Sequence, residues 1–287
     1  MKPQKTATIS VPPRLPAEEI DRAVAELDGT YESVSVMAGS LSFTTPMDLC
    51  GLRAFIEHAA IRADTVLFDC PSSGEVSRYL SRMDFYRDLP PNVRLSATPP
   101  TVRRTDRRQN LIELTRIRDV ADVQNFMARA SDIAHAHFGE RPVANACAVA
   151  LGAATENVIE HAESMIGALA AAQTYESGLE LAVVDLGIGI PTTLRRNPRF
   201  STLSDLEALE EALKYGVSSS GDLNRGIGLH ELISSVQAAG DSTLVLRSGY
   251  AHITISNRQP RPSLQRKTPG YFVPGTWIAV RMDPVNT

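Results

Sequence analysis

Cysteine and tryptophan are scarce in this chain, and neither sign of charge is in large excess. Its 287 residues include 3 cysteines and 1 tryptophan, and aromatic residues make up only 6%. Cys50, Cys70 and Cys147 are odd in number and far apart in the sequence, so we expect neither a disulfide framework nor a CxxC-type metal site. Reduced thiols at all three positions are the simplest interpretation.

Long hydrophobic runs are missing as well. No apolar run approaches the roughly 20 residues of a membrane-spanning helix, and the segment Met1–Thr6 has no apolar signal region. The hydrophobic content of 43% is typical of a globular protein, and the formal net charge of -4 provides no basic field that would attract nucleic acid or an anionic membrane. We therefore expect a cytoplasmic protein that does not bind membranes, and the charge and the few aromatic residues give nucleic-acid binding no support.

Residues 1–100 alternate between strand and helix patterns, which predicts a small α/β domain. Two Pro-Pro pairs, at Pro90-Pro91 and Pro99-Pro100, favour extended chain. We place a boundary there, so that the domains are 1–100 and 101–287. The predicted strands of the first domain are Thr6–Val11, Ser33–Met37 and Thr65–Cys70, and its predicted helices are Ala17–Leu27, Pro46–Ala60 and Val76–Met83.

Basic residues cluster just after this boundary, in the segment Arg103–Arg108. A contact with a polyanion and a solvated linker both fit such a cluster. The linker is favoured because no aromatic residues are interleaved and Asp106 interrupts the positive charge.

The second domain begins with helical patterns and continues with closely spaced strands. This order predicts an α/β sandwich in which helices pack on one face of a mixed sheet. The predicted helices are Val120–Ala136, Ala144–Ala172, Leu203–Lys214 and one from Gly228 to just before Gly240, and the predicted strands are Leu179–Asp185, Thr243–Arg247, Ala251–Ser256 and Thr276–Arg281.

Three motifs in the second domain carry the chemistry. The first, Glu156–His161 (ENVIEH), lies on a predicted helix, and the amide oxygen of Asn157 in it is a suitable hard ligand for Mg²⁺. The second, Asp185–Pro191 (DLGIGIP), follows an apolar strand. A buried carboxylate at Asp185 can accept a hydrogen bond from an exocyclic amine, and Gly187 and Gly189 allow the backbone to approach a ligand closely. Taken singly, a surface asparagine and a strand-to-turn aspartate without a ligand are the alternatives.

The third motif, Arg225–His230 (RGIGLH), opens a helix. Its bare N–H groups and the helix dipole suit a triphosphate, and Arg225 adds a charge-assisted contact. No strand immediately precedes Gly226 and Gly228, and the third glycine of a dinucleotide fingerprint is missing, so this is not a Rossmann motif.

In this order and with these spacings, the three motifs resemble the nucleotide-binding site of the GHKL superfamily. That superfamily includes gyrase, heat-shock chaperones of the same fold, histidine kinases and mismatch-repair ATPases. The resemblance covers roughly residues 110–285 and implies a Bergerat-type α/β sandwich that binds ATP and Mg²⁺. It also implies a mobile lid, for which we propose the span Pro191–Arg225.

The resemblance assigns a role to each matching residue. Asn157 matches the magnesium ligand, Asp185 contacts the adenine and Gly189 leaves room for its ring. Thr276, on the final strand, lies near the adenine, although a β-branched residue in a strand is an equal alternative. The remaining implied nucleotide-binding residues are Glu156, Gly187, Arg225, Gly226, Gly228 and Leu229.

One position departs from the superfamily pattern. Hydrolysing members carry a glutamate four residues before the magnesium asparagine, and here that position is Ala153. Glu160 shares the Asn157 face of the helix one turn later and is our first candidate for the general base. His161, whose usual pKa suits proton transfer, is the second candidate. The alternative is a site that binds ATP without hydrolysing it.

The first domain resembles a STAS-type module, the small α/β domain of anti-sigma antagonists. The segment Ser40–Pro46, followed by an amphipathic helix, and the segment Tyr79–Phe85 carry this resemblance, which covers roughly residues 30–95. Thr45 falls near the phosphorylatable serine of that family, but Thr44 replaces the usual acidic neighbour. We favour the alternative that Thr45 caps the helix that begins at Pro46.

Together these features predict an ATP-binding regulatory protein. We expect a nucleotide-dependent switch or a Ser/Thr protein kinase, similar to anti-sigma kinases, that acts on a protein partner with a STAS-like fold. The alternatives are a slow ATPase that changes conformation or forms a homodimer when it binds ATP, and a non-hydrolysing ATP-binding scaffold.

Overall fold

A computed structural model of the chain describes residues 5–14, 22–23, 26–27, 29–103, 110–139, 143–145, 152, 155, 163–164, 166–176, 178–214, 216–217, 228–238, 240–258 and 261–283. The chain divides into two compact units, Met1–Asp106 and Arg107–Thr287. Each unit combines helices with its own sheet, so the protein belongs to the α/β class. Most of the predicted linker Arg103–Arg108 lies outside the described residues.

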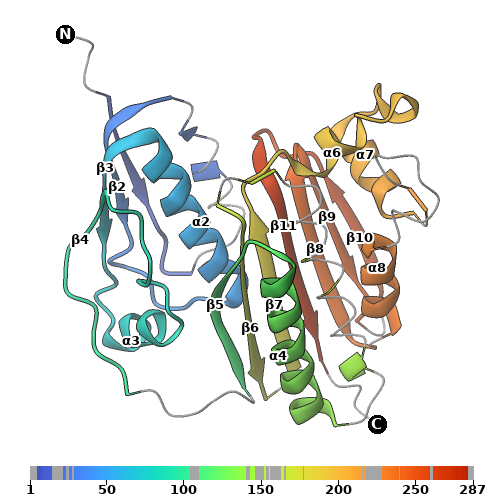
Figure 1. Cartoon of the computed structure of the whole chain (residues 1–287), viewed down its shortest axis with the longest axis horizontal. Coiled ribbons are helices and arrows are strands. Elements are labelled where there is room, and N and C mark those ends of the chain that lie inside the picture. The colour runs from blue at the N-terminus through green and yellow to red at the C-terminus, as the bar shows by residue number, and fades with distance from the viewer. Residues whose placement is uncertain are drawn as a thin grey trace. The chain divides into compact units, whose positions relative to one another are not determined.

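The first unit is built on a parallel sheet of four strands in the order β1-β2-β3-β4 (Figure 1). Its elements are β1 (Thr6–Ser10), β2 (Tyr31–Met37), α2 (Pro46–Arg62), β3 (Ala63–Asp69), α3 (Gly74–Arg82) and β4 (Val93–Leu95). The three predicted strands and the last two predicted helices are confirmed, and β4 is an additional short strand. Of the predicted helix Ala17–Leu27, four residues are described: Arg22, Ala23 and Glu26 are helical, and Leu27 is not.

The core of this unit lies between the sheet and α2. Val34 pairs with Val66 and Val36 with Phe68, so the four side chains share one face of β2 and β3, and all are fully buried. Phe55 on α2 is 1% exposed, and α2 packs against both strands. Burial of these branched and aromatic side chains is the main force that holds the helix on the sheet.

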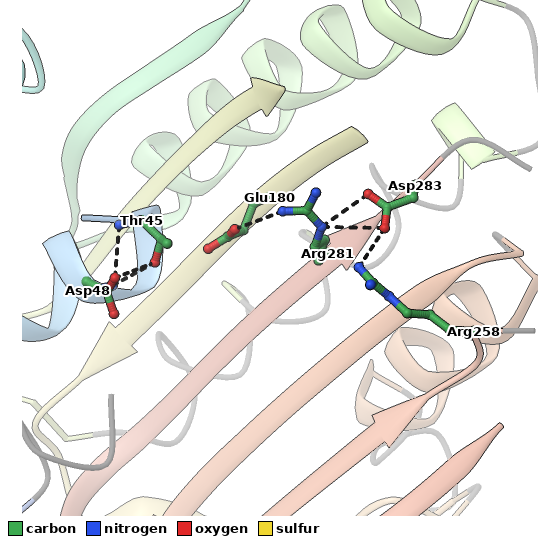
Figure 2. A network of polar contacts seen from close by, with 6 residues as sticks. All are labelled: Thr45, Asp48, Glu180, Arg258, Arg281 and Asp283. Carbon is green, nitrogen blue, oxygen red and sulfur yellow. Dashed lines mark hydrogen bonds and ion pairs between the residues drawn. The ribbon is translucent and has the colours of Figure 1, made fainter. Parts of the chain in front are cut away.

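A capping box starts α2, and Figure 2 shows its two side chains. The Thr45 side chain accepts a hydrogen bond from the Asp48 backbone nitrogen at 3.3 Å, and the Asp48 carboxylate accepts one from the Thr45 backbone nitrogen at 3.0 Å. Pro46 occupies the first turn, where its missing N–H costs no intrahelical bond. The interpretation of Thr45 as a helix N-cap is therefore confirmed.

A buried arginine joins α2 to the turn that follows α3. The Arg53 guanidinium is 2% exposed and donates to the Glu57 carboxylate at 2.8 Å. It also donates to the backbone oxygens of Phe85, Arg87 and Asp88, at 2.6, 2.8 and 2.7 Å. Asp88 itself adopts a positive φ of 51°. The planar head of arginine can satisfy this many acceptors because it carries five N–H groups.

The second unit contains a sheet of seven strands in the order β10-β9-β8-β11-β7-β6-β5. Every described pair of neighbouring strands is antiparallel, whereas the sequence predicts a mixed sheet. The difference arises because β6–β7 and β8–β9 are hairpins and β11 returns between β7 and β8. The elements are β5 (Leu111–Ile117), α4 (Val120–Phe138), β6 (Ala168–Tyr175), β7 (Gly178–Asp185), α6 (Gly189–Leu194), the 3-10 helix η1 (Pro198–Phe200), α7 (Asp205–Ala212), α8 (Gly228–Ala238), β8 (Ser242–Gly249), β9 (Ala251–Ser256), β10 (Ser263–Lys267) and β11 (Val273–Met282).

One face of this sheet forms the hydrophobic core with the helices. Val183 of β7 pairs with Ile278 of β11, which pairs with Leu246 of β8, so these three side chains share a face. The same core cluster includes Phe126 of α4 and Leu232 of α8. Both helices therefore pack on that face, and Figure 1 shows them alongside the strands.

The predicted helix Ala144–Ala172 is wrong in its last part. Residues 168–172 belong to β6, where Ala168 and Ala170 are fully buried and Leu169 is 2% exposed. Alanine favours helices in isolation, but β6 lies between β5 and β7 with both of its backbone edges paired. Packing in the sheet overrides the intrinsic preference. Most residues of this span before Gly167 lie outside the described part of the chain.

The described residues also bear on the cysteines and on membrane-spanning helices. Cys50 and Cys70 are free thiols, and Cys147 lies outside the described part of the chain. Within the described residues, we find no helix with the length and apolar character needed to cross a membrane.

Candidate functional site

Asp185 ends β7 and is fully buried. One oxygen of its carboxylate accepts a hydrogen bond from the backbone nitrogen of Gly187 at 2.7 Å, and the other accepts one from the backbone nitrogen of Thr276 at 3.1 Å. The second contact joins residues 91 positions apart. It forms because β7 pairs with β11 in a register that sets Val184 opposite Trp277, so the next residues of the two strands also meet.

Asp185 and Thr276 lie on the face of the sheet that carries the helices. Side chains alternate between faces along a strand, so Asp185 lies on the same face as Val183, and Thr276 on the same face as Ile278. Val183 and Ile278 both belong to the hydrophobic core. The carboxylate therefore lies at the edge of the layer between helices and sheet.

Burial raises the pKa of Asp185 to about 7, although the N–H groups of Gly187 and Thr276 act in the opposite direction. Desolvation disfavours the charged carboxylate, and two backbone donors compensate only in part. Each carboxylate oxygen accepts one hydrogen bond from these donors and has a second lone pair that can accept another. A buried carboxyl group that titrates near neutral pH is a candidate for function.

Two glycines, Gly275 beside Asp185 and Gly189 beside Ser248, have no room for a side chain. Gly275 has a φ of 73°, and a Cβ atom there would lie 2.1 Å from the Asp185 backbone oxygen. Gly189 has a φ of 78°, and its Cβ atom would lie 2.5 Å from the Ser248 hydroxyl and 2.9 Å from the Gly275 oxygen. Only glycine fits at either position. At Gly189, the space that a side chain would fill is therefore bounded by atoms of the protein itself.

Ser248, near the end of β8, completes the cluster. Its side chain is fully buried, donates to the Gly275 oxygen at 2.6 Å and accepts from the Ile190 nitrogen at 2.9 Å. Sequence reasoning missed Ser248. The available signal was a serine directly after the predicted strand Thr243–Arg247, next to a glycine.

The other predicted site residues fall into two groups. Gly228 is the first residue of α8, and Leu229 in its first turn is 8% exposed and part of the core. Ala153 and the predicted site residues Glu156, Asn157, Glu160, His161, Arg225 and Gly226 lie outside the described residues. Within the described part, no cluster of three or more histidine, cysteine or acidic residues forms a metal site.

The first part of the predicted lid packs firmly on the sheet. Leu194, Phe200 and Leu209 lie in the hydrophobic core. Asp205, the first residue of α7, accepts hydrogen bonds from the Arg195 side chain and, at 2.7 Å, from the Tyr250 backbone nitrogen. The part of the predicted lid up to Lys214 is therefore held against the sheet, and lid closure stays a prediction. After Lys214, only Gly216 and Val217 of that span are described.

A separate polar network lies at the other end of β7 and β11, and Figure 2 shows its side chains. Glu180 contacts the Arg281 guanidinium at 3.7 Å, and Arg281 donates to Asp283 at 3.1 Å. Arg258 also contacts Asp283, at 2.7 Å. Because Glu180 is on the same strand as Asp185 and already has an ion-pair partner, it is a useful control for experiments on the site.

No protein-family model and no curated protein matches this chain. The residues of the site and the order of the motifs are therefore the features of this chain that indicate a function.

Proposed function

We propose that the chain is an ATP-binding regulatory protein of the GHKL type, in which the second unit binds the nucleotide and the first unit is a STAS-like module. The observation that carries the proposal is the position of Asp185. This buried carboxylate, held by the N–H groups of Gly187 and Thr276, unites two predicted adenine contacts that are 91 residues apart in the sequence.

The chemistry of this cluster suits the 6-amino group of adenine. An ionised Asp185 can accept a hydrogen bond from that amine through the lone pairs that Gly187 and Thr276 leave unused. A purine with oxygen at position 6 would instead place an acceptor against the carboxylate. Such a site rejects the wrong base strongly, because its buried polar groups would lose their partners.

The start of α8 suits the phosphates. Gly228 opens this helix within the third motif, and the buried side chain of Leu229 anchors its first turn to the core. The N–H groups at a helix N-terminus and the helix dipole attract negative charge. By resemblance, Asn157 would hold Mg²⁺, which would neutralise charge on the phosphate oxygens.

For the biological role, we propose a nucleotide-dependent switch or a Ser/Thr protein kinase that acts on a protein partner with a STAS-like fold. This rests on the likeness of the motifs to anti-sigma kinases and on a first unit that is a small α/β domain. A slow ATPase that changes conformation or dimerises, and a non-hydrolysing scaffold, remain the alternatives because residue 153 is alanine.

Binding of Mg-ATP tests the proposal directly. At pH 8, where Asp185 is ionised, we expect the full-length protein to bind Mg-ATP in calorimetry, and Asp185→Asn to weaken binding about tenfold or more, because it removes a charge-assisted hydrogen bond. Glu180→Gln changes a carboxylate on the same strand that is outside the cluster, so its affinity should match the wild type. Absence of ATP binding by the wild type, or equal affinities of the wild type and Asp185→Asn, would overturn the proposal.

A further inference from the structure

The Ser248 hydroxyl contacts two segments of the candidate site at once. It accepts a hydrogen bond from Ile190, in the first turn of α6, and donates one to the Gly275 oxygen just before Thr276. All of these atoms are buried, so neither water nor an exposed side chain can replace the hydroxyl. Three elements, α6, β8 and β11, therefore meet at one oxygen atom.

The peptide that accepts from Ser248 is the same one that holds Asp185. The Gly275 oxygen and the Thr276 nitrogen belong to a single planar peptide group, so they point in opposite directions. On one side this group accepts from Ser248 at 2.6 Å, and on the other it donates to Asp185 at 3.1 Å. The hydroxyl thus sets the angle at which the peptide presents its N–H to the carboxylate.

These contacts close a ring of hydrogen bonds. The Gly187 N–H group donates to the Asp185 carboxylate, and the backbone continues from Gly187 to Ile190, whose N–H group donates to Ser248. Ser248 then leads through the Gly275–Thr276 peptide back to Asp185. Hydrogen bonds in such a chain polarise one another, so loss of one weakens the others.

We propose that Ser248 is a positioning residue for the adenine end of the nucleotide site, which it orients through the Gly275–Thr276 peptide and Asp185. The inference rests on the proposed nucleotide-binding function. Ser248 thereby contributes to selectivity for a 6-amino purine, while the binding of the phosphates depends on other residues.

Ser242 provides a matched control on the same strand. Like Ser248, it is fully buried on the core face of β8, and its hydroxyl donates to the backbone oxygens of Val236 and Gly240. Substitution of Ser242 by alanine removes a buried hydroxyl at the opposite end of β8. A general effect of losing such a group should therefore appear equally in both variants.

The experiment compares the affinities of the full-length protein for Mg-ATP and Mg-ITP, which differ in the amine or oxygen at position 6 of the purine. For Ser248→Ala we expect ATP affinity to fall about tenfold and ITP affinity to stay within about twofold, so the ATP preference decreases. Ser242→Ala should keep the wild-type ratio. Ser248→Cys, which keeps the shape of the side chain but is somewhat larger and has only a weak S–H donor, should lie between the two and provides a second variant if the alanine variant does not fold.

Each result has a distinct meaning. A wild-type ATP-to-ITP ratio in Ser248→Ala and Ser248→Cys, with ATP binding intact, would overturn the role of Ser248 and leave the proposed function standing. Equal loss of both nucleotides in Ser248→Ala and Ser242→Ala would also overturn it, as a purely structural effect. If the wild type bound neither nucleotide, the proposed function and this inference would both fail.

Discussion

At the scale of single residues, Asp185 shows how burial and hydrogen bonding compete. Burial raises its pKa to about 7, and the bonds from Gly187 and Thr276 offset only part of that rise. The motif itself was visible in the sequence, and so was the glycine requirement at Gly189. Ser248 was not, because its importance comes from two backbone partners that lie far from it along the chain.

This pKa predicts that the stability of the second unit depends on pH. The folded carboxyl keeps its proton up to about pH 7, whereas the unfolded one releases it near the usual value of 3.8. The stabilisation is therefore complete below pH 3.8 and is lost as the pH rises through 7. As the pH rises from 5 to 8, we expect the ionisation of Asp185 to decrease the free energy of unfolding by about 3 kcal/mol.

Urea unfolding at the two pH values, followed by fluorescence, measures this effect. Trp277 is the only tryptophan and is fully buried beside Thr276, so its emission reports on the second unit. Asp185→Asn should lose the pH dependence attributed to this group, and Glu180→Gln should keep it. The same pH dependence in Asp185→Asn and the wild type would show that other groups cause it.

At the scale of elements, patterns of residues predicted most boundaries well. Ala251–Ser256 is a strand as predicted, and α2 starts at Pro46 because Thr45 and Asp48 form a capping box. The failures share one cause. Ala168–Ala172 forms part of β6, and β5 and β10 were missed, because their strand character depends on pairing with neighbours rather than on a local period.

Within the first unit, Arg53 should be the residue of α2 whose polar contacts matter most for stability. Arg53→Met removes four hydrogen bonds and breaks the buried ion pair between Arg53 and the Glu57 carboxylate. We expect a loss of about 3–5 kcal/mol in the free energy of unfolding, measured by urea denaturation with circular dichroism. Arg62→Met, in the last turn of the same helix, should cost less than about 1 kcal/mol. Equal stability of the two variants would contradict this role.

At the scale of the whole molecule, strand order decides which chain segments form the candidate site. β11 comes last in the sequence, yet it lies between β7 and β8. That insertion brings Thr276 to Asp185 and Gly275 to Ser248. The glycine motif after β7 therefore acquires its partners only when the last strand of the chain is in place.

Hydrolysis of bound ATP is a property of the full-length protein. We expect the purified protein to form ADP from Mg-ATP slowly or not at all, because Ala153 cannot accept a proton from water. Ala153→Glu should then produce turnover, and Asn157→Ala should abolish it through loss of the proposed Mg²⁺ ligand. ADP assays of the three proteins measure this.

The outcomes separate the proposed roles. Turnover by the wild type that disappears in Asn157→Ala would mean that another group replaces the missing glutamate, with Glu160→Gln and then His161→Ala as the next variants. Phosphate transfer to a partner protein would favour the kinase. ATP binding with neither product would favour the scaffold.

Local composition determined much of this protein: its α/β class, most helices and strands, the helix cap at Thr45, and the glycine-rich turn after Asp185. These features depend on neighbouring residues, whose spacing and caps can be recognised in the sequence. The tertiary structure decided the antiparallel pairing of the second sheet, the strand identity of β6 and the ring that joins Asp185 to Ser248. These depend on contacts between distant segments, because buried polar groups must find partners wherever the fold brings them.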